Sequence, residues 1–111
     1  PSSAASDVYK RQHDLLLCPS ASISPFPVEK RFVTEIDGRI CETYIDWFAI
    51  TFAITMTSCP ALSLPVGFTQ AGLPVGLQVV GPPRGEASLL RACHRMEAVF
   101  GLAAALPIDP R

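Results

Sequence analysis

The stretch PALSLPVGF (60–68), followed by GLPVGLQVVG (72–81), decides the fold. Large and small residues alternate along both halves, and this period of two is typical of β-strands. The connection TQAG (69–72) has the length and the glycine of a hairpin loop. The pattern predicts a β-hairpin over about residues 61–67 and 74–80, with one bulky and one small face. The bulky face carries Leu62, Leu64, Val66, Phe68, Leu73, Val75, Leu77 and Val79. The small face carries Ala61, Ser63, Pro65, Gly67, Pro74, Gly76, Gln78 and Val80.

The pattern changes after Gly85, where apolar residues recur at helical spacing over residues 86–100. An amphipathic helix is therefore predicted there, with an acidic residue, Glu86, in its first turn and Gly101 as its stop. Its apolar stripe consists of Leu89, Leu90, Cys93, Met96 and Phe100. We expect this helix to pack on either the bulky or the small face of the hairpin.

Shorter elements are predicted before the hairpin. The apolar run LLL (15–17), ended by Cys18 and Pro19, indicates a buried strand, and SASISPFP (20–27) an extended loop. The dipeptide DG (37–38) indicates a two-residue turn. From Tyr44, apolar residues at spacings of three and four predict a helix that Ser58 and Pro60 end.

The charge pattern indicates burial. No Asp, Glu, Lys or Arg occurs between Trp47 and Pro83. A transmembrane helix needs roughly 20 apolar residues, but prolines and glycines interrupt this stretch, so burial in protein explains it better than burial in lipid. We interpret the chain as the inner part of a larger α/β domain.

Composition excludes several classes of function. With 111 residues, 49% hydrophobic content and a net charge of −1, the chain is too apolar for a disordered tail and lacks the basic surface that nucleic acid or an anionic membrane requires. Its four cysteines show neither CxxC nor zinc-ligand spacing, so no metal or cofactor is expected. Apolar neighbours favour free thiols at Cys59 and Cys93, and hence an intracellular, cytoplasmic setting.

The domain boundary is placed at residue 13. Residues 1–12, PSSAASDVYKRQ, show no regular period and are interpreted as a linker, tag or joining remnant, with a frayed native helix as the alternative. Residues 13–111 then form one incomplete domain.

No catalytic set emerges from the residues alone. The segment GPPRGE (81–86) lies where phosphate loops occur, but its prolines lack the N–H groups of a phosphate cradle, so a plain connection is favoured. Cys59 and His94 could supply a nucleophile and a base, yet their spacing does not support the pair. Capping and turn hydrogen bonds explain Thr55, Thr57 and Ser58 better than catalysis does.

Two blocks carry a family resemblance: DLLLCPSAS (14–22) and the run from WFAITF to CHRME (47–97). They resemble the C-terminal part of amidase-signature enzymes, over about residues 13–100. The resemblance implies a mixed β-sheet sandwiched between helices and hydrolysis or transfer of carboxamides. It also implies a Ser–Ser–Lys catalytic relay, whose residues lie N-terminal to the matched part. Lys10 and Lys30, the two lysines present, do not stand in that context.

The resemblance leads to one set of candidate site residues. Ile45, Phe48 and Phe52 share a helix face, and the corresponding helix in the family borders the substrate channel, so we expect them to line the acyl side of the pocket. The alternative is that they are ordinary core residues.

Several questions of function stay open at this point. A small-molecule amide is the expected substrate of the parent enzyme, and a homo-oligomer remains open. One alternative to an amidase fragment is a truncated paralogue or assembly subunit without catalysis. Another is a glutaminase-like subunit of a tRNA-dependent amidotransferase.

Overall fold

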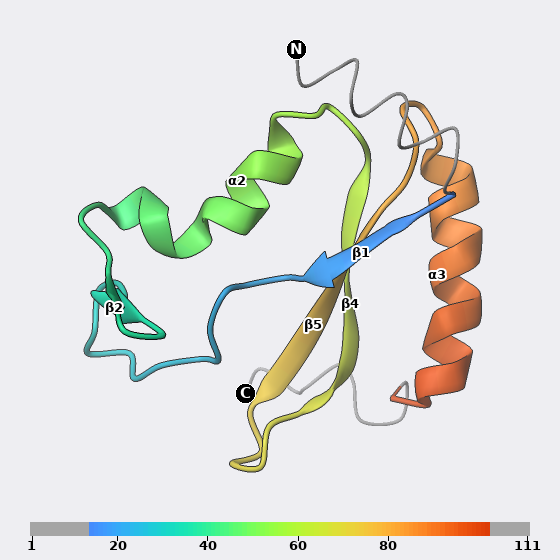
Figure 1. The fold of residues 1–111 in the computed structure, drawn as a ribbon. Coiled ribbons are helices and arrows are strands. Elements are labelled where there is room, and N and C mark those ends of the chain that lie inside the picture. The colour runs from blue at the N-terminus through green and yellow to red at the C-terminus, as the bar shows by residue number, and fades with distance from the viewer. Residues whose placement is uncertain (1–13, 103–111) are drawn as a thin grey trace.

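The computed structural model describes residues 14–102 (Figure 1). The predicted appendage at residues 1–12 lies outside this range, so the boundary at residue 13 stays a prediction. Along the chain, the elements are β1 (Leu16–Pro19), β2 (Glu35–Ile36), β3 (Arg39–Ile40), the 3-10 helix η1 (Tyr44–Phe48), α2 (Ala49–Thr55), β4 (Ala61–Phe68), β5 (Pro74–Val80) and α3 (Glu86–Phe100).

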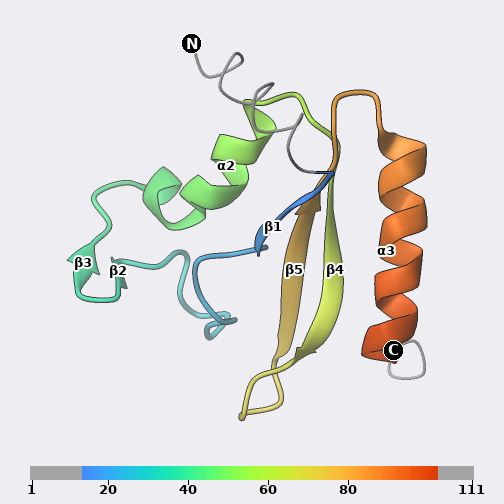
Figure 2. The ribbon, with the colours of Figure 1, turned by 45° about the vertical axis from the view of Figure 1, so that its right-hand side comes forward.

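Three antiparallel strands form the main sheet, in the order β1-β5-β4. Both outer strands meet the end of β5 at the same residue, because Leu16 and Ala61 each pair with Val80. In Figure 2, α3 lies on one side of the β4–β5 hairpin, whereas α2 and η1 lie on the other. The predicted α/β class, the hairpin and the helix that follows it are confirmed. Each outer strand contains a proline, Pro19 in β1 and Pro65 in β4.

The bulky face of the hairpin packs against α3, which decides between the two packings left open above. Leu64 and Val79 of the sheet and Leu89 and Cys93 of α3 are at most 5% exposed. Burial also raises the pKa of the Cys93 thiol, which behaves as a small apolar side chain here. Partly buried side chains extend this core: Leu15, Leu62, Leu77 and Met96.

The apolar stripe predicted for α3 is narrower than expected. Leu90 is 58% exposed and Phe100 is 39% exposed, so neither belongs to the core. Leu90 is turned by about 100° from Leu89 around the helix axis, away from the sheet. The predicted stop is confirmed: Gly101 is left-handed, with φ 67°, and its N–H donates to the carbonyl of Glu97.

A β-bulge interrupts the alternation that was predicted for the whole of β4. Pro65 pairs with Gly76 and Gly67 pairs with Val75, which leaves Val66 without a partner residue on β5. Because one extra residue breaks the period of two, the bulky face does not continue to the end of the strand. Phe68 is 47% exposed instead of being part of the core.

The single helix predicted from Tyr44 is divided into η1 and α2. Phe48, with φ −115° and ψ 23°, lies outside the α-helical range and separates them. At the other end, Ser58 has a positive φ of 59°, and the hydroxyl of Thr57 accepts a hydrogen bond from the N–H of Cys59 at 3.2 Å. These residues end the helix, as predicted, and Thr57 acts in the turn hydrogen bonding expected of it.

Two other local predictions differ in their outcome. Asp37 and Gly38 both have positive φ, as a tight hairpin turn between β2 and β3 requires, so that turn is confirmed. The strand predicted at residues 15–17 exists as β1 but is not fully buried, since it is an outer strand and Leu17 is 49% exposed.

All four cysteines are free, in line with the prediction for Cys59 and Cys93. Within residues 14–102, no helix has the length and apolar character needed to cross a membrane.

Candidate functional site

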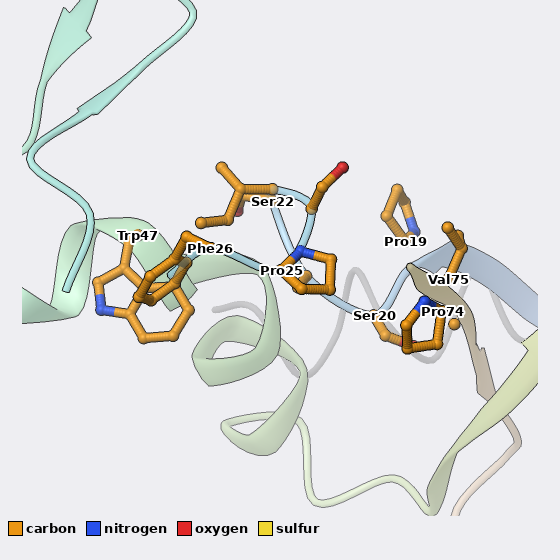
Figure 3. A pocket seen from close by; sticks show the side chains of 12 residues that line it. Pro19, Ser20, Ser22, Pro25, Phe26, Trp47, Pro74 and Val75 are labelled. Atoms are coloured by element: carbon orange, nitrogen blue, oxygen red, sulfur yellow. The ribbon is translucent and has the colours of Figure 1, made fainter. Parts of the chain in front are cut away.

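A cavity of about 420 Å³ opens where the segment after β1 meets the start of β5. It is lined by residues 19–26, by Trp47 of η1 and by residues 74–76 of β5. In Figure 3, Phe26 and Trp47 lie at one end of this pocket, Ser20, Pro74 and Val75 at the other, and Pro25 between them. The volume is within the range of small-molecule sites in proteins. We call it the β1–β5 pocket.

Among residues 14–102, no charged side chain lines the β1–β5 pocket. Two other cavities differ in this respect. One, of about 420 Å³, includes Asp14, Arg91 and Arg95; the other, of about 530 Å³, includes Lys30, Arg31 and Glu35. The β1–β5 pocket combines apolar and aromatic walls with serine hydroxyls, and this lining suits an uncharged ligand.

Ser20 is fixed in the pocket by all of its polar groups. Its backbone N–H donates to the carbonyl of Gly76 at 3.2 Å, and its carbonyl accepts from the Thr51 hydroxyl at 3.0 Å. Its Oγ lies 2.6 Å from the Oγ of Ser63. Ser20 therefore joins the segment after β1 to α2, β5 and β4.

Gly76 makes room for the two hydroxyls. A Cβ at this position would lie 2.7 Å from Ser63 Oγ and 2.8 Å from Ser20 Oγ, closer than such atoms approach. The bare backbone of β5 thus lets Ser20 and Ser63 meet across it. A second polar contact lies along β1 and β5, where the Gln78 amide, on a side chain 7% exposed, donates to the Cys18 sulfur at 3.3 Å.

An aromatic cluster forms the other end of the pocket. The ring of Trp47 meets those of Phe26, Tyr44 and Phe48 in edge-to-face contacts, with centroids 5.6–5.7 Å apart. The buried Trp47 Nε1 has no hydrogen-bond partner among the described residues. Since aromatic faces accept N–H groups only weakly, the cluster fixes the ring mainly by packing.

The start of η1 is fixed by the carboxylate of Asp46. Its Oδ2 accepts hydrogen bonds from the backbone N–H groups of Glu42 at 2.8 Å and of Thr43 at 3.1 Å. The bond from Thr43 is the main cause that holds the pKa of Asp46 below its ordinary value. This contact sets where the helix that carries Trp47 begins.

Two of the chemical alternatives weighed from sequence, Thr55 and the loop at residues 81–86, make structural hydrogen bonds. The Thr55 hydroxyl donates to the carbonyl of Thr51 within α2. The loop at residues 81–86 is closed by a bond from the N–H of Gly85 to the carbonyl of Pro82, so this N–H is not available to an anion. In the part of the chain that the structure describes, no group of three metal-binding side chains is present.

Comparison with known proteins assigns the family. The family profile named Amidase matches residues 4–90. The chain belongs to the amidase family. An acylamidase of Rhodococcus erythropolis is 32% identical over 102 residues, which cover 91% of this chain and 21% of that protein. A glutamyl-tRNA(Gln) amidotransferase subunit from Myxococcus xanthus is 36% identical over 87 residues, covering 78% of this chain and 17% of that protein.

A solved structure supports the amidase fold. A bacterial aryl acylamidase of the amidase-signature family superposes with a TM-score of 0.73 at 23% identity, over 94% of this chain and 23% of that one. The resemblance predicted from residues 13–100 is therefore confirmed. The chain spans about a fifth of the length of the relatives that it matches.

The three residues predicted from sequence to line the acyl side of the substrate pocket are not among the residues that line the β1–β5 pocket. Ile45 is 50% exposed and Phe52 is 47% exposed, whereas Phe48 packs against Tyr44 and Trp47. Phe48 is connected to the pocket through its contact with Trp47. Their role as an acyl-side wall in the full domain stays a prediction.

Sequence reasoning missed three residues that line the β1–β5 pocket, Ser20, Trp47 and Gly76. It also missed Ser63, whose Oγ lies 2.6 Å from that of Ser20. The small face of the hairpin was recognised, which places Ser63 and Gly76 on one side of the sheet. Ser20, however, was assigned only to an extended loop, because no local pattern shows that the loop folds back over β5. The start of the uncharged stretch at Trp47 was the one signal for the aromatic end.

Proposed function

We propose that the protein is the C-terminal part of an amidase-signature hydrolase that cleaves carboxamide C–N bonds. The observation that carries this proposal is the match of the Amidase family profile to residues 4–90. The β1–β5 pocket supports it, because a cavity with uncharged walls and serine hydroxyls suits a neutral amide. The described residues would contribute a wall of the substrate site.

The catalytic relay would come from outside the 111 residues. Acyl transfer needs an activated nucleophile, a base within hydrogen-bond reach and donors for the developing oxyanion. The family resemblance places its Ser–Ser–Lys relay N-terminal to the matched part. Lys30 lies at the charged cavity with Arg31 and Glu35, and not in the lining of the β1–β5 pocket. We therefore expect no amide hydrolysis by the chain alone.

Part of a glutamyl-tRNA(Gln) amidotransferase is the second candidate, because relatives of that name match this chain. Glutamine carries a charged ammonium and a charged carboxylate, and burying either without a counter-ion is costly. The described residues that line the β1–β5 pocket offer no such counter-ion. The pocket thus favours a simple amide over glutamine. Turnover distinguishes the amide hydrolase and the amidotransferase from a non-catalytic paralogue that only assembles with a partner.

A segment graft tests the proposal. Residues 14–102 replace the matched segment of the Rhodococcus erythropolis acylamidase, and release of the amine product is measured. We expect the graft to hydrolyse amides, while the host lacking the segment and the isolated chain do not. A graft that is folded and monodisperse but without turnover would overturn the proposal in favour of a non-catalytic paralogue.

A further inference from the structure

Among the described residues, the Ser20–Ser63 pair has one hydroxyl hydrogen that their shared hydrogen bond does not use. Two hydroxyls joined by one hydrogen bond use one of their two hydrogens, so the other is available. Because Ser63 is exposed on β4 and Ser20 lines the β1–β5 pocket, the geometry allows Ser63 to donate to Ser20 Oγ while Ser20 donates into the pocket. The backbone bonds of Ser20 to Gly76 and from Thr51 hold its position without using its hydroxyl.

The opposite end of the same pocket suits a planar apolar group. Phe26 and Trp47 meet edge to face with ring centroids 5.7 Å apart, and Pro25 lies between this pair and Ser20 in Figure 3. Flat rings and proline rings offer contact area with little loss of side-chain freedom. A ligand with an aromatic ring and one polar acceptor matches both ends.

We propose that the β1–β5 pocket binds an uncharged aryl carboxamide and that Ser20, positioned by Ser63, selects it by donating a hydrogen bond to the amide oxygen. This inference rests on the proposed amide hydrolase, and it goes further by naming the class of substrate and the residue that recognises it. Ser20 is a specificity-determining residue, and Ser63 is a positioning residue. Charged analogues of the same shape should bind more weakly, because no charged side chain of the described residues lines the pocket to balance their charge.

Trp47 provides the measurement. It is the single tryptophan of the sequence and it lines the pocket, so its fluorescence reports occupancy directly. The full 111-residue chain is titrated with benzamide, benzoate and benzamidine, which share a shape but are neutral, anionic and cationic. We expect benzamide to bind at least about tenfold more tightly than either charged probe. Equal affinities, or no response to benzamide, would overturn the proposal.

Substitutions then test the role of each hydroxyl. Ser20→Ala is expected to weaken benzamide binding about fivefold, the loss of one hydrogen bond, whereas Ser20→Thr retains a hydroxyl and most of the affinity. Ser63→Ala, on an exposed side chain, is expected to cause a smaller loss of about twofold. Ser88→Ala on α3, on the other side of the sheet, is the matched control and leaves binding unchanged.

The outcomes separate this inference from the proposed function. If Ser20→Ala keeps a native circular dichroism spectrum and the affinity for benzamide is unchanged, Ser20 does not recognise the amide. If Ser20→Ala unfolds, the affinities of Ser20→Thr and Ser63→Ala for benzamide still test the proposal. Equal losses of affinity in Ser63→Ala and Ser88→Ala would contradict the positioning of Ser20 by Ser63. The titration reads binding only, so it can succeed when the acylamidase graft is inactive, and it can fail when the graft is active.

Discussion

Gly76 allows Ser20 and Ser63 to approach each other because it has no side chain. A methyl group there would lie within 2.8 Å of both hydroxyl oxygens, and backbone bonds restrict how far Ser20 can move. We expect Gly76→Ala to lower the free energy of unfolding by about 1–3 kcal/mol through overpacking. Urea denaturation of the full chain measures this change.

Gly67 is the matched control for that substitution. It lies on the neighbouring strand β4, and a Cβ added there meets nothing within 4 Å. Gly67→Ala should therefore leave the unfolding midpoint nearly unchanged. Equal destabilisation by both alanines would show that the effect comes from glycine flexibility in strands and not from the contact between the two hydroxyls.

At Asp46, the direction of the pKa shift predicts a pH dependence. Its pKa is lowered in the folded chain, chiefly by the hydrogen bond from the Thr43 N–H. The stabilisation of the η1 start is therefore fully present above the ordinary Asp pKa of about 3.9 and is lost as the pH falls through the lower folded value. The amide resonances of Glu42 and Thr43 should shift with pH in this window. Asp46→Ala should remove that titration, and a titration that persists in this variant would contradict the assignment.

Among the helices, η1 and α2 show how far a local pattern can be used. Apolar spacing predicted their existence and their end, but not the break at Phe48 or the aromatic cluster around Trp47. That cluster joins Phe26 to Trp47, two residues whose contact depends on the path of the intervening loop and the β2–β3 hairpin. Periodicity carries information about one element at a time. Contacts between loops therefore had to come from the structure.

The hairpin and α3 were predicted with nearly correct bounds for the same reason. Their patterns are strong and local, and the turn residues agree with them. The bulge at Val66 was not predicted, because an alternating sequence looks the same whether or not one residue lacks a partner. The site was predicted only in part: the small face was found, whereas the Ser20 contact across Gly76 depends on the pairing of β1 with β5.

Phe48, at the end of η1, can be used to test the prediction that Ile45, Phe48 and Phe52 line the acyl side of the substrate pocket. It contacts Tyr44 and Trp47, and Trp47 lines the β1–β5 pocket. In the acylamidase graft, we expect Phe48→Ala to change the ratio of kcat/KM between aryl and alkyl amides more than it changes the melting temperature. Loss of stability with an unchanged substrate ratio would show instead that Phe48 is an ordinary packing residue. Phe52→Ala, on an exposed side chain, provides the comparison.

Across the part of the molecule that the structure describes, many large apolar side chains are exposed to solvent. They include Ile40, Tyr44, Ile45, Phe52, Met56, Leu90 and Val99.

This surface predicts how the isolated chain behaves. We expect the purified 111-residue chain to self-associate as its concentration is raised, because apolar side chains are exposed. We also expect it to release no ammonia from simple carboxamides, because the family resemblance places the catalytic relay outside this chain. Light scattering and an ammonia assay measure the two properties. The same segment should be monodisperse in the graft. A monomeric, cooperatively folded chain with turnover that depends on Ser58 or Cys59 would contradict both expectations.

The prolines of the two outer strands bear on the form that such association takes. Growth of a fibril adds identical strands along an edge, and each added strand needs a continuous row of N–H donors in register. Pro19 in β1 and Pro65 in β4 lack this donor, and the bulge after Pro65 also disturbs the register. Either edge of the sheet is thus a poor template for amyloid. Clusters of this chain should consequently be amorphous, held by side chains, and dispersible by mild detergent.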